Sequence, residues 1–151
     1  MMYTLLRKLL FQFSPESVHH FAMDTLRQGR RVPFAGALLQ GAFTPRGKHL
    51  PRTVWGLPFR NPVGLGAGFD KNARYLAELD TLGFGFVEIG TVTPRPQPGN
   101  ERPRLFRLPT DRALINRMGF NNDGADAAAA RVRAWRARRP GVLGELTFTT
   151  K

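Results

Sequence analysis

The sequence contains no cysteine, which excludes disulfides, thiolate metal ligands and a cysteine nucleophile. It has no run of the roughly 18 uninterrupted apolar residues that a membrane-spanning helix needs. Acidic residues are also few, because 11 Asp and Glu stand against 23 Lys and Arg, for a formal net charge of +12. This excess predicts either an anionic partner or simply an arginine-rich solvated surface. With 42% hydrophobic residues, the composition is that of a globular chain.

The densest basic cluster falls on a predicted helix near the C-terminal end and comprises Arg131, Arg133, Arg136, Arg138 and Arg139. It lacks the interleaved aromatic residues expected of single-strand binding. The chain also shows no zinc-finger spacing, RNA-recognition signature or basic zipper. We therefore expect no nucleic-acid partner and no metal site, although a basic nucleic-acid-binding module is kept as a minor alternative.

The first 13 residues are mostly apolar but are interrupted by Arg7 and Lys8. No small-residue cleavage site follows them, so a secretory signal is not predicted. The pattern favours an interfacial helix with its apolar side in lipid and its basic residues near the headgroups. The alternative is a helix packed on the domain's own core.

A second helix is predicted to start at Ser14, a hydroxyl cap followed by proline at the first turn. Its apolar residues Val18, Phe21, Ala22 and Leu26 share one face, and Gly29 is expected to end it. A shorter apolar helix follows over 34–39. We therefore predict that residues 1–52 form a small helical, membrane-associating domain.

From residue 53 onward the pattern alternates between strand and helix. Thr53–Trp55, turned by Gly56–Pro58, predicts a hairpin. A strand over 61–68, a helix over 75–82 and a strand over 84–93 predict a right-handed parallel unit. A proline-rich loop over 94–109, a helix over 125–138 and a third strand beginning at 141–144 follow.

Three segments could carry chemistry. The first, Gly64–Gly68, is glycine-rich and lets a flat ring or phosphate approach the backbone, with Lys71 as a nearby cation. In the second, Thr91 is expected beside Lys71, since ligands collect at the C-terminal ends of parallel strands. The third, Asn116–Asn121, offers amide donors and acceptors to a urea-like ring edge. Taken singly, each segment could equally be an ordinary turn.

Together and in this order, the three segments resemble the class 2 (quinone-dependent) dihydroorotate dehydrogenases. The matched stretches are Asn61–Asn72, Phe84–Leu108 and Ile115–Asn122, and Ser14–His19 resembles the N-terminal extension that marks this class. The resemblance implies an α/β fold for residues 53–151: the first two to three units of an incomplete (β/α)₈ TIM barrel.

The resemblance also implies roles for individual residues. Ala67, Gly68, Lys71 and Thr91 are expected to bind FMN, with Lys71 also reaching the substrate carboxylate. The orotate site is expected to include Lys71 and the segment Asn116, Arg117, Met118, Gly119 and Phe120. His19 and Arg107 match polar residues of a quinone tunnel between the helical cap and the barrel.

The implied reaction is the oxidation of dihydroorotate to orotate in de novo pyrimidine (UMP) biosynthesis. A proton leaves substrate C5, a hydride passes from C6 to flavin N5, and electrons then pass to a membrane quinone. Proton removal needs a base near the substrate, which in this class is a serine in a later loop, beyond residue 151. The expected location is peripheral, on the cytoplasmic face of the inner (cell) membrane.

After Gly144 the sequence departs from the family pattern, which continues with a strand carrying an FMN-binding asparagine. Leu146 stands at that asparagine's position and its side chain cannot hydrogen-bond. We therefore expect the N-terminal part of the enzyme only, from a frameshift, a misassembled gene or a deliberate fragment, and expect it to be inactive alone. A non-catalytic, basic membrane-binding remnant is the alternative function.

Overall fold

The computed structural model describes residues 2–44 and 51–138. Its N-terminal part consists of three helices, α1 (Met2–Leu10), α2 (Pro15–Arg31) and α3 (Ala35–Phe43). None of the side chains on α1 is buried among the described residues. Among the described residues, no helix is both long enough and apolar enough to cross a bilayer.

Helix α2 begins as predicted, because the Ser14 hydroxyl accepts a hydrogen bond from the Ser17 backbone N–H at 3.2 Å. It ends at Arg31 and so runs past Gly29, where the sequence predicted its end. Val32 adopts extended backbone, and its N–H donates to the Gly29 carbonyl. The following Pro33 accounts for this end, because proline disfavours helical geometry in the residue before it.

Within residues 51–138, the structure contains three two-stranded sheets. Strands β1 (Arg52–Val54) and β2 (Leu57–Phe59) form the predicted hairpin. Its turn lies at Trp55 and Gly56, which both have positive φ, so Leu57 and Pro58 belong to the second strand and not to the turn.

The predicted strand–helix–strand unit is present as β3 (Gly64–Leu65), α4 (Leu76–Thr81) and β4 (Phe86–Val87), with β3 and β4 parallel. All three elements are shorter than predicted. Backbone hydrogen bonds extend the contact between these two segments on both sides of β3 and β4. Gly85 N–H donates to Val63 O, and Gly68 N–H donates to Gly90 O, both at 2.8 Å. The described residues contain no closed barrel, and the third strand predicted at 141–144 lies outside them.

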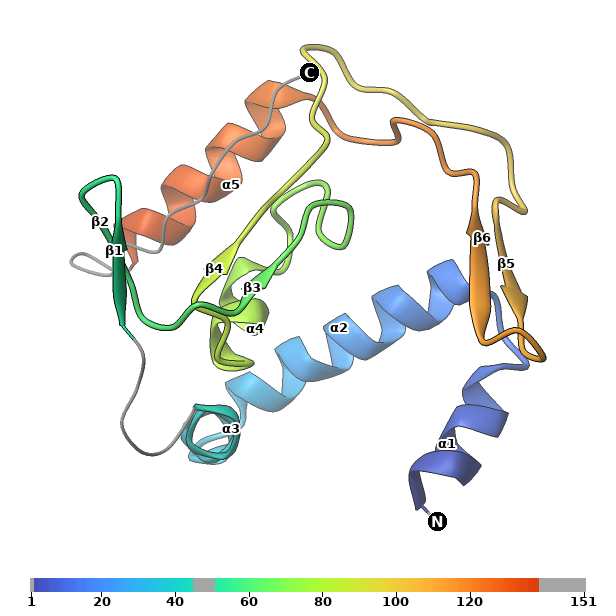
Figure 1. Ribbon diagram of the computed structural model, residues 1–151, viewed down its shortest axis with the longest axis horizontal. Coiled ribbons are helices and arrows are strands. Elements are labelled where there is room, and N and C mark those ends of the chain that lie inside the picture. Colours follow the sequence, from blue (N-terminus) through green and yellow to red (C-terminus); the bar gives the residue numbers. More distant parts are fainter. Residues whose placement is uncertain (1, 45–50, 139–151) are drawn as a thin grey trace.

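The proline-rich segment is not wholly a loop. It contains β5 (Leu105–Leu108), which pairs antiparallel with β6 (Ala113–Asn116). Helix α5 (Ala125–Ala137) follows close to its predicted position. In Figure 1 the β5–β6 hairpin lies at the N-terminal end of α2, beside α1, whereas α3 lies at the other end of α2.

Helix α4 separates two small cores. On one side Leu76 packs with Ile89, Val92 and residues of α5. On the other, Tyr75 and the fully buried Leu79 pack with Met23 of α2. The cap helix α2 is thus attached to the strand–helix–strand unit through apolar burial, the main favourable contribution to folding.

The substitution Leu79→Ala should lower the free energy of unfolding by about 2–4 kcal/mol, because it leaves a cavity in the core that joins α2 to α4. Urea unfolding followed by circular dichroism measures this change. Leu38→Ala on α3 is the control, since Leu38 is 76% exposed. An equal loss of stability in both variants would contradict the assigned core.

Candidate functional site

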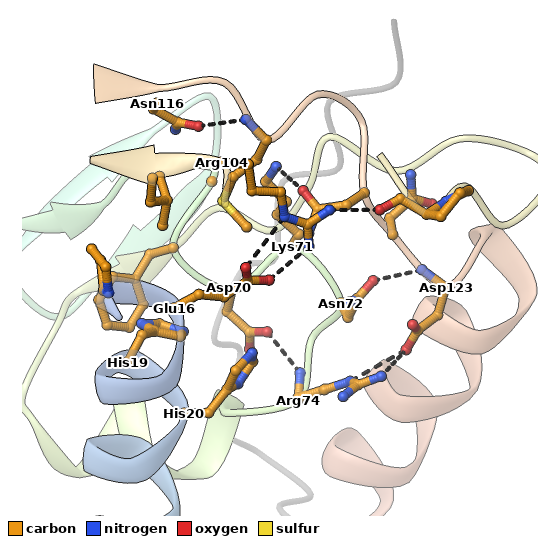
Figure 2. A pocket seen from close by; sticks show the side chains of 18 of the residues that line it. Glu16, His19, His20, Asp70, Lys71, Asn72, Arg74, Arg104, Asn116 and Asp123 are labelled. Atoms are coloured by element: carbon orange, nitrogen blue, oxygen red, sulfur yellow. Dashed lines mark hydrogen bonds and ion pairs between the residues drawn. The ribbon is translucent and has the colours of Figure 1, made fainter. Parts of the chain in front are cut away.

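A cavity of about 470 Å³ lies between the N-terminal end of α2, the turn after β3 and the segment after β6. Figure 2 shows Glu16 and His19 on α2 at one side of it and Asp123, just before α5, at the other. Of the residues predicted to bind ligands, five line this cavity: His19, Gly68, Lys71, Asn116 and Met118. The structure therefore brings together members of two of the three predicted segments, the glycine turn with Lys71 and Asn116–Asn121, but not Thr91.

Lys71 is the central cation of the cavity. Its ammonium donates to the Gly119 carbonyl oxygen at 3.0 Å and to Asn121 Oδ1 at 2.6 Å. Burial lowers the pKa of Lys71, and the positive charge of Arg104 lowers it further. The glycine turn and the 116–121 segment thus meet at one charged side chain, although they are far apart in the sequence.

Asp70, beside Lys71, shapes the turn that presents it. The Asp70 carboxylate accepts the backbone N–H groups of Arg74 at 2.8 Å and of Tyr75 at 2.7 Å. Burial raises the pKa of Asp70, although these hydrogen bonds oppose the shift. This carboxylate therefore holds the turn between Lys71 and the start of α4 and fixes the chain direction there.

Asn122 is a buried junction between two loops. Its side chain bonds to Thr93 and accepts the Gly124 N–H at 2.9 Å, while its backbone pairs with Gln97. Asn100 adds a second link, because its side-chain amide donates to the Arg117 carbonyl at 2.6 Å. The segment around 116–122 is therefore held against the 97–100 loop.

Arg104 connects this loop to the helical cap. Its guanidinium donates to Glu16 at 2.6 Å and to the carbonyls of Pro98 and Asn100 at 2.7 and 3.0 Å. Arg104 is only 7% exposed. The hydrogen bond from Arg104 lowers the pKa of Glu16 against the opposing effect of burial. Arg102 pairs with the same carboxylate at 2.9 Å.

His19 lies half-buried on α2 with its ring edge-on to Phe69, at 4.6 Å between ring centroids. Burial lowers the pKa of His19. The neighbouring His20 contacts the Tyr75 hydroxyl through Nδ1 at 2.9 Å. These rings form the wall of the cavity that the cap contributes.

Six of the predicted residues do not line the cavity. They are Ala67, Thr91, Arg107, Arg117, Gly119 and Phe120. Of these, Gly119 still reaches Lys71 through its carbonyl, while the Phe120 side chain is 58% exposed. Arg107 contacts the turn after α1: its guanidinium lies over the Phe11 ring at 4.5 Å and donates to the Phe13 carbonyl at 2.6 Å.

Sequence reasoning missed the ion pair between Glu16 and Arg104, and it missed Asn122 as a junction. Glu16 was visible only as a helix-start residue, and Arg104 was one of 23 basic residues. A pairing across 88 positions leaves no local signal. Asn122 lies at the end of a predicted segment, so its position, though not its contacts, was accessible.

The family model for dihydroorotate dehydrogenase matches residues 49–147. The relative from Pseudomonas aeruginosa, "Dihydroorotate dehydrogenase (quinone)", is 57% identical over 143 residues, which cover 95% of this chain and 40% of the relative. The protein of the same name from Christiangramia forsetii is 52% identical, covering 87% of this chain and 38% of the relative.

Solved structures agree. The crystal structure of ligand-free DHODH from Eimeria tenella superimposes with a TM-score of 0.65 at 38% identity, covering 91% of this chain and 37% of that one. The complex of the same enzyme with ferulenol gives 0.63 at 37% identity, covering 91% and 35%. The chain spans about two fifths of the length of these relatives.

Replacing Glu16 with Gln should reduce the free energy of unfolding by about 1–3 kcal/mol at neutral pH, because Arg104 loses its charged acceptor. The pKa of Glu16 is lower in the folded state, so its contribution is full above the unfolded value of 4.5 and is lost as pH falls through the folded value. The difference between wild type and variant should therefore shrink in acid.

Denaturant unfolding at about pH 7 and at about pH 3 measures this difference. Glu101→Gln is the charge-matched control, because Glu101 is exposed and makes no ion pair in the described part of the chain. A stability difference that is independent of pH would show that the ion pair does not contribute as stated.

The sequence match, the coverage and the superposition lead to one assignment: this chain belongs to the dihydroorotate dehydrogenase family, as a homologue of its quinone-dependent members.

Proposed function

We propose that this chain supplies the N-terminal part of an FMN-dependent enzyme that oxidises dihydroorotate to orotate with a quinone as electron acceptor, in de novo pyrimidine biosynthesis. The observation that carries this proposal is Lys71, which joins the glycine turn to the 116–121 segment inside a cavity. In a member of this family, that position suits an anionic substrate. Residues 1–52 would be the membrane-facing cap, and residues 53–151 the first units of the (β/α)₈ barrel.

The glycine turn fits a flat cofactor. A Cβ added at Gly66 or Gly68 would meet no atom within 4 Å, so this side of the backbone is open. Gly68 also has a φ of +102°, which side chains rarely tolerate. We assign Ala67, Gly68, Lys71 and Thr91 to FMN. The cofactor supplies the redox chemistry when bound, and the protein positions the reactants.

The substrate would lie over Lys71 and the segment that follows β6. The Lys71 ammonium pairs with a carboxylate, while Asn116–Phe120 supply amide and apolar contacts. Asn116 Oδ1 already accepts the Met118 N–H at 3.0 Å, which leaves its NH₂ to donate to a ring oxygen. The proton-abstracting base would be a serine of the remaining barrel and is not assigned to any residue of this chain.

The cap would receive the quinone and contact the membrane. We assign His19 and Arg107 to the quinone tunnel, since both lie between the cap and the strands. Large apolar side chains on α1 are exposed to solvent, with Tyr3 and Leu5 at 73% and Leu9 at 56%. Exposed apolar patches of this kind mark interaction surfaces. We propose that these side chains attach the protein peripherally to the cytoplasmic face of the inner membrane.

A chimera tests the catalytic assignment. This chain should replace the matching N-terminal part of the Pseudomonas aeruginosa relative and give a protein with a flavin spectrum and quinone-coupled dihydroorotate oxidation. In that chimera Lys71→Ala should lower kcat/KM by at least about a hundredfold, because a half-buried charged partner of the substrate is lost. The 151-residue polypeptide alone should show no turnover.

Lys8→Ala in the same chimera is the matched control, since Lys8 lies on α1 and outside the cavity. A chimera that folds and binds flavin but tolerates Lys71→Ala would refute the assigned substrate cation. Turnover by the 151-residue polypeptide would refute the expectation that it is inactive.

The exposed apolar face of α1 also supports the second candidate function, a membrane-binding remnant without catalysis. The double variant Leu5→Glu/Leu9→Glu should lower the fraction of chain that pellets with phosphatidylglycerol-containing vesicles by about tenfold, since charges replace the apolar contact. Val63→Glu, at a position 62% exposed but outside the cap, should pellet normally. Equal pelleting of the wild type, the double variant and Val63→Glu would refute membrane binding through α1. Membrane binding combined with an inactive chimera would favour the remnant.

A further inference from the structure

A second cavity, of about 680 Å³, lies across α4 between α2 and α5. It shares only Arg74 with the cavity around Lys71. Its lining is unusually basic, because six arginines accompany a single carboxylate, that of Glu78. The arginines are Arg27, Arg30, Arg31, Arg74, Arg131 and Arg138.

The nearby acids neutralise only part of this charge. Glu78 pairs with Arg27 at 3.5 Å and with Arg30 at 3.3 Å. Asp123, outside the lining, is shared by Arg74 and Arg131, both at 2.7 Å. The side chains of Arg31 and Arg138 form no ion pair or hydrogen bond with the residues that the structure describes. Asp24, also outside the lining, pairs with Arg27 at 3.3 Å, so three carboxylates face six guanidinium groups.

Two of the guanidinium groups, those of Arg27 and Arg131, also contact uncharged groups. Arg27 donates to the Arg74 carbonyl at 2.6 Å and lies over the Tyr75 ring at 5.0 Å. Arg131 donates to the Asn72 carbonyl at 2.9 Å. Trp135 also lines the cavity, and its buried indole N–H has no hydrogen-bond partner among the described residues. The cavity thus holds oriented donors and a surplus of positive charge before any ligand arrives.

We propose that this cavity binds an anion carrying clustered phosphate groups. Guanidinium groups match phosphate oxygens with two parallel hydrogen bonds, which ammonium groups cannot do. A volume of about 680 Å³ lies in the range of small-molecule sites and exceeds what a single phosphate would fill. Such a ligand could be a soluble polyphosphate or the headgroups of an anionic lipid, since both present the same chemistry.

The test is calorimetric titration of the chain with sodium tripolyphosphate at low ionic strength. The double variant Arg31→Gln/Arg138→Gln removes two guanidinium groups that make no ion pair or hydrogen bond with the described residues, so its thermal midpoint should be unchanged. It should raise Kd about tenfold through the loss of two charge-assisted contacts. Added salt should weaken binding to the wild type.

The matched control is Arg133→Gln/Arg136→Gln, which removes the same amount of charge from α5, close to Arg138 in the sequence but outside the cavity lining. This variant should bind like the wild type. Absence of saturable binding, or an equal loss in both double variants, would overturn the proposal, because general charge attraction would then explain the result.

Vesicles distinguish the two sources of phosphate. Phosphatidylcholine vesicles containing phosphatidic acid should displace tripolyphosphate if lipid headgroups are the ligand, and pure phosphatidylcholine vesicles should not. Binding of tripolyphosphate without such displacement assigns a soluble polyphosphate to the cavity.

Discussion

The bond between Arg104 and Glu16 determines how the helical cap sits on the rest of the molecule. Glu16 begins the cap helix α2, and Arg104 precedes β5. The same guanidinium holds the carbonyls of Pro98 and Asn100, and Asn100 holds the segment after β6. A buried charge pair of this kind is costly to break, since the surviving partner stays desolvated. The cap and the 116–122 segment are consequently linked by a continuous series of hydrogen bonds.

Apolar packing and polar bonds attach different parts of α2 to the rest of the molecule. At the middle of α2, Met23 packs on Tyr75 and Leu79. Apolar contacts of this kind do not require a specific direction. Near its N-terminal end, Glu16 meets Arg104 with directional bonds. Burial therefore provides most of the attachment, whereas the ion pair fixes the register. A cap attached by burial alone could rotate or slide along its own axis.

Local features were predictable because local chemistry causes them. The Ser14 cap and the order strand, helix, strand follow from residue type and apolar spacing. The strand Leu105–Leu108 was missed because prolines flank it on both sides and favour a loop interpretation. The strands were also predicted too long, since apolar runs do not show where pairing stops. Contacts such as Arg104 with Glu16 depend on tertiary packing, which leaves no periodic signal.

Lys71 shows how a flexible side chain becomes a directional one. An ammonium group has three donors arranged about one axis. Two of them are engaged, by the Gly119 carbonyl and by Asn121 Oδ1. Once two N–H vectors are fixed, the third has a single direction, so rotation about the Cε–Nζ bond is stopped. The entropy cost of orienting this donor is therefore incurred during folding and not on binding. A carboxylate that approaches along the third N–H direction meets a donor that is already oriented, instead of a freely rotating ammonium group.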